Sequence, residues 1–217
     1  MLRVREQSLI TQVIWLTLVV STLFALAVGR WSLAFVSLAT LSLSVAPLIL
    51  ASRFRITLPV PFLAATTLFI FASVFMGEAF DFYERVWWWD LALHGASALG
   101  FGLFGFLFVF MLFEGDRYAA PAGALALISF CFAMMVGSIW EIFEFTMDQA
   151  FGLHMQKSGL VDTMFDLIVN AFGAGIAAIS GYLYLIGRAY GLPGTLIEEF
   201  VRRNRRLYQK SRQRFRK

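Results

Sequence analysis

Acidic side chains and a histidine recur at helical spacing inside long apolar stretches of this 217-residue chain. Three groups share this feature: Asp90 with His94, Glu141 with Glu144, and Asp162 with Asp166 and Asn170. Residues three or four apart lie on one face of an α-helix, so each group should line one side of its helix. Charged groups within a membrane are costly and usually face a functional interior.

Carboxylates grouped with an imidazole are suited to binding a divalent cation. Oxygen ligands favour Mg²⁺, Mn²⁺ or Ca²⁺, and a histidine also admits Zn²⁺. The metal ligands that we expect are His94, Glu141, Glu144, Asp162 and Asp166. Such an ion could polarise a phosphoryl or carbonyl oxygen, or activate water. The catalytic candidates are Asp90, His94, Glu141, Glu144 and Asp166, with Asn170 orienting one of them. The alternative is a structural network of hydrogen bonds without any ion.

The elements that carry these residues are predicted to span a membrane. Hydrophobic residues make up 59% of the chain, and charged residues 15%, against roughly 25% in a typical soluble domain. Six apolar blocks of about the 20 residues needed to cross a bilayer cover residues 9–28, 32–51, 58–75, 88–113, 121–145 and 164–186. The first block could also be a signal peptide, but its length favours a membrane helix. The sequence predicts an all-α bundle of six transmembrane helices.

Basic residues predict the orientation of this bundle. Of 18 Lys and Arg residues, only Arg30, Arg85 and Lys157 fall outside if both termini are cytoplasmic. This distribution follows the positive-inside rule. With that orientation, the three polar groups all converge on the outer face, where the start of the fourth helix, the end of the fifth and the start of the sixth meet.

The C-terminal tail has a different character, so we expect a membrane domain over residues 1–192 and a basic tail over 193–217. Pro193 is expected to break the chain, and Thr195 with Glu198 has the spacing of a capping box. Five apolar residues fall on one helical face among the arginines: Ile197, Phe200, Val201, Tyr208 and Phe215. A basic amphipathic helix from Arg202 to Lys217 is expected to bind anionic lipids of the inner leaflet. A membrane protein partner is the alternative, and nucleic acid is not expected.

Three ordered motifs carry a family resemblance: Trp-Asp-Leu-Ala-Leu-His at 89–94, Trp-Glu-Ile-Phe-Glu at 140–144, and Asp-Thr-Met-Phe-Asp-Leu-Ile-Val-Asn-Ala-Phe-Gly-Ala at 162–174. They resemble the YjdF-like family of bacterial inner-membrane proteins and, more distantly, the VanZ-like group. Glu144 and Lys157 depart from the VanZ-like pattern, which would have glutamine and arginine, and so favour the YjdF-like family. The resemblance implies a multi-pass protein of the bacterial inner (cytoplasmic) membrane and supplies no reaction.

Three functions fit these residues. The first is metal-assisted chemistry on a lipid or envelope intermediate at the outer, periplasmic face. The second is a non-catalytic accessory or assembly role. The third is a small cation- or proton-coupled transporter, against which the inner halves of the last three helices count, because residues 103–113, 122–136 and 174–186 hold no charge.

Overall fold

The computed structural model describes residues 7–113 and 120–209, and these residues form helices without strands. Six helical spans within them are long and apolar enough to cross a membrane, which confirms the all-α, six-span prediction. They are α1 (Leu9–Ala27), α2 (Trp31–Phe54), α3 (Val60–Ile70) with the π-helix η2 (Phe71–Ala79), α5 (Trp89–Leu112), α6 (Ala122–Phe151) and α7 (Leu160–Leu185). Short helices follow η2 (α4, Phe82–Arg85) and α7 (α8, Gly191–Arg203; α9, Arg205–Gln209).

Four of the six spans are longer than the apolar blocks that predicted them, and two of these four carry polar groups. α6 continues to Phe151, and α7 begins already at Leu160. The carboxylates that ended the apolar blocks lie on helical turns, since Asp148 is inside α6 and Asp162 is in the first turn of α7. Hydropathy therefore marked where the apolar surface ends, and the helices continue past it.

The chain divides into two compact units, Met1–Trp89 and Asp90–Lys217. In the first unit, α1 packs along α2, and the Trp15 indole N–H donates to Ser44 Oγ at 3.0 Å. Ile14, Leu18 and Phe75 form its small buried core. This unit contains none of the residues in the three polar groups.

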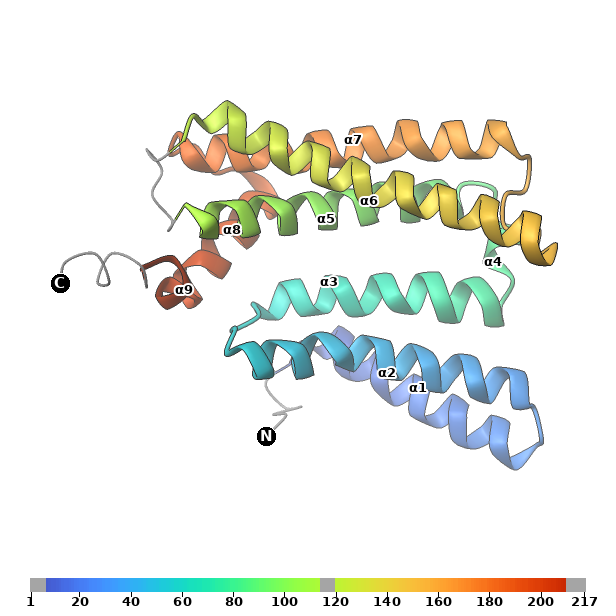
Figure 1. The fold of residues 1–217 in the computed structure, drawn as a ribbon. Helices are drawn as coiled ribbons and strands as arrows, with labels where there is room; N and C mark the ends of the chain where they lie inside the picture. The colour runs from blue at the N-terminus through green and yellow to red at the C-terminus, as the bar shows by residue number, and fades with distance from the viewer. Residues whose placement is uncertain (1–6, 114–119, 210–217) are drawn as a thin grey trace. The chain divides into compact units, whose positions relative to one another are not determined.

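In the second unit, α5, α6 and α7 lie side by side (Figure 1), and α6 runs antiparallel to the other two. Small residues let α5 and α7 approach closely: a Cβ on Gly102 would stand 2.5 Å from Ala177 Cβ. The Ser129 hydroxyl of α6 donates to the Gly102 carbonyl of α5 at 2.7 Å. Close helix contacts through small residues and interhelical hydrogen bonds are typical of membrane bundles.

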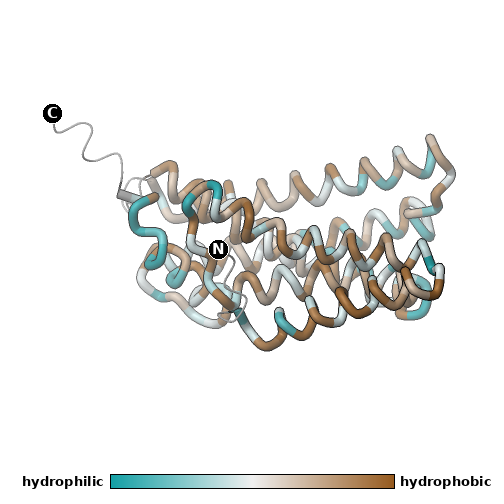
Figure 2. Tube along the Cα trace, turned by 90° about the horizontal axis from the view of Figure 1, so that it is seen from below, coloured by the Kyte–Doolittle hydropathy of each residue, from teal (hydrophilic) through white to brown (hydrophobic). Residues whose placement is uncertain are grey.

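The outward surface of the long helices is apolar. Large side chains such as Phe101, Phe104 and Ile179 are exposed, while polar residues such as Ser129 and Asn170 are buried. Figure 2 shows hydrophobic residues along most of each long helix and hydrophilic ones mainly near helix ends and in α8 and α9. This distribution suits a lipid environment and not water, so the chain is a multi-pass membrane protein that contacts the bilayer.

The start of the tail differs from the predicted one. α8 begins at Gly191 and runs through Pro193, and the Thr195 hydroxyl donates to the Leu192 carbonyl, so the capping box with Glu198 is wrong. Proline is tolerated here because it lies in the first helical turn, whose N–H groups have no intrahelical partner.

The predicted apolar face of the tail packs against protein. Ile197 and Tyr208 are buried in the same core as Leu107 and Phe110 of α5. The Tyr208 hydroxyl donates to the Leu107 carbonyl at 3.5 Å, and its ring centroid is 5.5 Å from that of Phe110. Phe215, Arg3, Arg5, Arg117 and the last basic residues lie outside the described residues. The boundary between membrane domain and tail at residue 193 stays a prediction.

Candidate functional site

The structure brings most of the predicted polar residues together at one end of α5, α6 and α7. His94 comes from the second turn of α5, Glu141 and Glu144 from the C-terminal half of α6, and Asp166 and Asn170 from the first three turns of α7. All five are buried. The antiparallel order of the three helices produces this convergence, as the sequence predicted.

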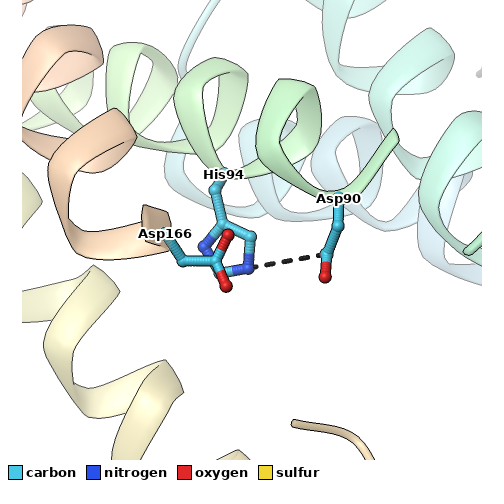
Figure 3. A group of neighbouring side chains, drawn as sticks. All are labelled: Asp90, His94 and Asp166. Carbon is cyan, nitrogen blue, oxygen red and sulfur yellow. Dashed lines mark ion pairs between the residues drawn. The ribbon is translucent and has the colours of Figure 1, made fainter. Parts of the chain in front are cut away.

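The His94 imidazole lies between two carboxylates on its two ring nitrogens. Its Nε2 is 3.6 Å from Asp90 Oδ1, and its Nδ1 is 3.5 Å from Glu141 Oε1. Figure 3 shows Asp90 opposite Nε2 and Asp166 beside the ring. Asp90 and His94 are one turn apart on the same helix, so the backbone of α5 holds this pair in register.

Two sets of side chains could each bind a metal ion. The first is Asp90, His94 and Asp166, and the second is His94, Glu141 and Glu144. Within each set, one ligand atom per residue lies within 4.8 Å of the others. Because His94 belongs to both sets, the imidazole is the centre of the cluster.

Several buried polar atoms in this cluster have no hydrogen-bond partner among the described residues. They are both carboxylate oxygens of Glu141, Oδ2 of Asp166, and both amide atoms of Asn170. Leaving a buried polar group unpaired costs roughly 1–3 kcal/mol, and more for a charged group. An ion, a water molecule or a proton at these positions would reduce this cost.

Two neighbouring residues shape the site: Trp140, which the sequence placed in the motif at 140–144, and Gly137, which the sequence interpretation missed. The Trp140 indole N–H donates to Glu144 Oε1 at 2.9 Å and fixes that carboxylate. Gly137 faces Asn170, because a Cβ there would stand 2.5 Å from Asn170 Nδ2. Gly137 could have been found from spacing, since it lies four residues before Glu141 on the same helix.

Asp162 is the predicted metal ligand that belongs to neither set. It is half-buried, and its Oδ2 accepts the backbone N–H of Lys157 at 3.1 Å. Asp148, one turn beyond Glu144, accepts the backbone N–H groups of Met155 and Gln156 at 2.6 and 2.8 Å. These two carboxylates hold the connection between α6 and α7, in which Gly152 has a left-handed backbone.

Comparison with known proteins identifies the family. The model of the family "Predicted membrane protein (DUF2238)" matches residues 7–187, so the chain belongs to this family. An uncharacterized protein of Thermotoga maritima is 32% identical over 132 residues, which cover 59% of this chain and 67% of that relative. No solved structure matches significantly.

Proposed function

We propose that this DUF2238 protein binds a divalent cation in the buried cluster around His94 and uses it for chemistry on a lipid or envelope intermediate. The observation that carries this proposal is the set of unpaired, buried oxygens on Glu141 and Asp166 beside an imidazole. We also propose that the protein is related to the YjdF-like family and, more distantly, to the VanZ-like group, and that it is located in the bacterial inner membrane.

The charge of the cluster supports a cation. Asp90, Glu141, Glu144 and Asp166 surround one histidine, and three of these four carboxylates are buried. Like charges in a low-dielectric site repel each other strongly, so the site must bind protons or a cation to remain folded. A bound ion would also satisfy the unpaired oxygens, which protonation alone satisfies only in part.

The two nitrogens of His94 suggest a division of roles. Nδ1 faces Glu141, whose oxygens make no hydrogen bond of regular geometry among the described residues, and would bind the ion together with Glu141 and Glu144. Nε2 faces Asp90, which is partly exposed and would orient the ring, as carboxylates behind metal-binding histidines usually do. The bound ion would polarise a substrate oxygen or activate water. Asp166, from the other set that shares His94, offers a further carboxylate oxygen to the ion.

The proposed orientation defines the substrate class. With both termini in the cytoplasm, the cluster would lie toward the outer face, within about three turns of the helix ends. A lipid-linked intermediate of the outer leaflet would reach this depth while its tail stayed in the bilayer. The Trp87 and Trp88 side chains are exposed at the start of the fourth span, where aromatic residues typically mark the interface.

Elemental analysis and metal titration of the full-length protein test this function. We expect one tightly bound divalent ion, lost in Glu141→Gln, and a cellular phenotype that Glu141→Gln and Asp166→Asn abolish. Glu78→Gln is the matched control, because Glu78 is an exposed carboxylate outside the cluster. The proposal fails if the protein binds no divalent ion and both cluster variants keep the phenotype.

A non-catalytic accessory role is the second candidate, and one feature of the tail favours it. α8 and α9 expose Arg202, Arg203, Arg205 and Arg206 while their apolar face is covered. A fixed basic surface suits anionic inner-leaflet lipids or an acidic membrane protein. If replacing these arginines by glutamine removes a co-purifying protein and the Glu141→Gln variant keeps the phenotype, the accessory role is the better account.

A further inference from the structure

Asn170 is the most deeply buried polar side chain of the cluster. It is 0% exposed, and neither its amide nitrogen nor its amide oxygen makes a hydrogen bond of regular geometry with another described residue, although the His94 imidazole is close enough to interact with it. It lies one turn after Asp166 on α7 and next to His94. A leucine of similar size would fill this space without the cost of burying an unpaired amide.

The structure also makes room for this amide from a second helix. Gly137 of α6 lacks the Cβ that would stand 2.5 Å from Asn170 Nδ2 and 3.1 Å from Cγ. Glycine inside a helix costs about 0.5–1 kcal/mol relative to alanine. The buried amide of Asn170 and the glycine at 137 each lower stability, and together they make room for one amide between facing helices. This arrangement is expected if the amide binds a ligand.

We propose that Asn170 Oδ1 ligates the cation, and that the completed ligand set selects a hard, six-coordinate ion of the Mn²⁺ and Mg²⁺ class over tetrahedral Zn²⁺. This inference rests on the proposed function, because it concerns the same cluster. It assigns to Asn170 direct contact with the ion, beyond the orienting role expected from the sequence.

The donor atoms lead to this ion class. Glu141, Glu144 and Asp166 offer carboxylate oxygens, Asn170 an amide oxygen and His94 one nitrogen. Asp166 belongs to one set and Glu141 with Glu144 to the other, and the two sets share His94. An ion that used donors from both sets together with Asn170 would have four oxygens and one nitrogen, which leaves one octahedral position for water or a substrate oxygen. Zn²⁺ sites favour four ligands with nitrogen or sulfur, whereas oxygen-rich octahedral sites favour Mg²⁺ and Mn²⁺.

Two substitutions of Asn170 separate ligation from hydrogen bonding. Asn170→Asp keeps an oxygen at the ligating position but removes the amide donor. Asn170→Leu removes both and leaves similar bulk. If Oδ1 is the ligand, Asn170→Asp retains Mn²⁺ binding, and Asn170→Leu weakens it by at least the roughly 10–100-fold that the loss of an outer-shell partner costs. If Nδ2 acts as a donor instead, both variants lose affinity equally.

Stability provides an independent readout that shows whether each variant folds. Without metal, Asn170→Leu should unfold at a higher temperature than the unsubstituted protein, because it removes an unpaired buried amide. A gain in apo stability together with a loss of ion affinity would mark Asn170 as a ligand-binding residue. If Asn170→Leu does not fold, Asn170→Ala serves the same comparison, since it cannot overfill the site.

The experiment uses full-length protein in nanodiscs, titrated with Mn²⁺ by electron paramagnetic resonance and with Co²⁺ by visible absorption. We expect one Mn²⁺ per chain and the weak Co²⁺ bands of six-coordination. Intense tetrahedral Co²⁺ bands, or Mn²⁺ affinity unchanged in Asn170→Leu, would contradict the role of Asn170 and the octahedral geometry. The proposed cation site itself would not be contradicted by either result. Binding of neither Mn²⁺, Mg²⁺, Ca²⁺ nor Zn²⁺ would overturn the proposed function itself.

Discussion

Replacing Gly173 by alanine should separate the two helices that position the site. Gly173 is on α7, one turn after Asn170, and faces the backbone of α5. An added Cβ would lie well inside 3.0 Å of the Gly95 carbonyl oxygen and 3.1 Å from both Ala98 Cβ and Leu99 N. Backbone atoms cannot rotate away as a side-chain tip can, so the helices themselves must move.

The size of the effect follows from this contact. Ordinary contact begins at 3.4 Å, so the helices must separate by more than 0.4 Å. Overpacking a close interface typically costs about 1–3 kcal/mol. For a chain of about 200 residues this corresponds to a decrease of about 2–12 °C in melting temperature. The movement also draws Asp166 and Asn170 away from His94, so metal affinity should decrease as well.

Gly175→Ala is the matched control, because a Cβ on Gly175 would meet nothing within 4 Å. Alanine favours the helix more than glycine does, so this variant should be as stable as the unsubstituted protein or slightly more so. Both are purified in the same detergent, and melting temperature and bound metal are measured together. If Gly173→Ala melts and binds metal like Gly175→Ala, close packing of α5 on α7 does not position the site.

Three further predictions concern the tail, the topology and pH. Ile197→Ala removes a fully buried side chain and should expose the tail to protease, at a cost of up to about 2–5 kcal/mol, whereas Leu192→Ala, at an exposed position, should not. In a Cys131→Ser background, Ser158→Cys should react with an impermeant thiol reagent added to whole cells, and Thr195→Cys should react only after lysis; the reverse result would invert the topology. Divalent-ion affinity should decrease as the pH is lowered, because protons compete for the ligands, and a pH-independent affinity measured by titration would contradict carboxylate ligation.

The six spans were predictable because apolar length alone decides whether a helix can cross a bilayer. The ends of the spans were less predictable, since Asp148 and Asp162 suit either a loop or the terminal turn of a helix. In the structure each carboxylate remains on its helix and accepts backbone N–H groups from the connection between α6 and α7. Hydropathy cannot distinguish these cases, because it contains no information about hydrogen-bond partners.

The convergence of the polar groups was predictable from helix order, because alternating directions bring the start of α5, the end of α6 and the start of α7 to one end. The partner that each side chain contacts was not predictable. Asp90 and Asp162 have the same residue type and similar spacing to a neighbour, yet Asp90 faces His94 while Asp162 binds the Lys157 backbone. The rotation of each helix decides this, and it depends on packing at Gly102 and Gly173, which the spacing of charges does not reveal.

The tail shows what an amphipathic pattern leaves open. The sequence identified the apolar face of Ile197 and Tyr208, but lipid and protein offer such a face a similar environment. Here the face is covered by protein, and the Tyr208 hydroxyl reaches a carbonyl 101 positions earlier in the chain. Burial, with Tyr184 nearby, raises the pKa of the Tyr208 phenol, so it remains a neutral donor. Because the apolar face is already occupied, Arg202 and Arg206 must act as a charged outer surface, and any lipid they bind is held at its headgroup.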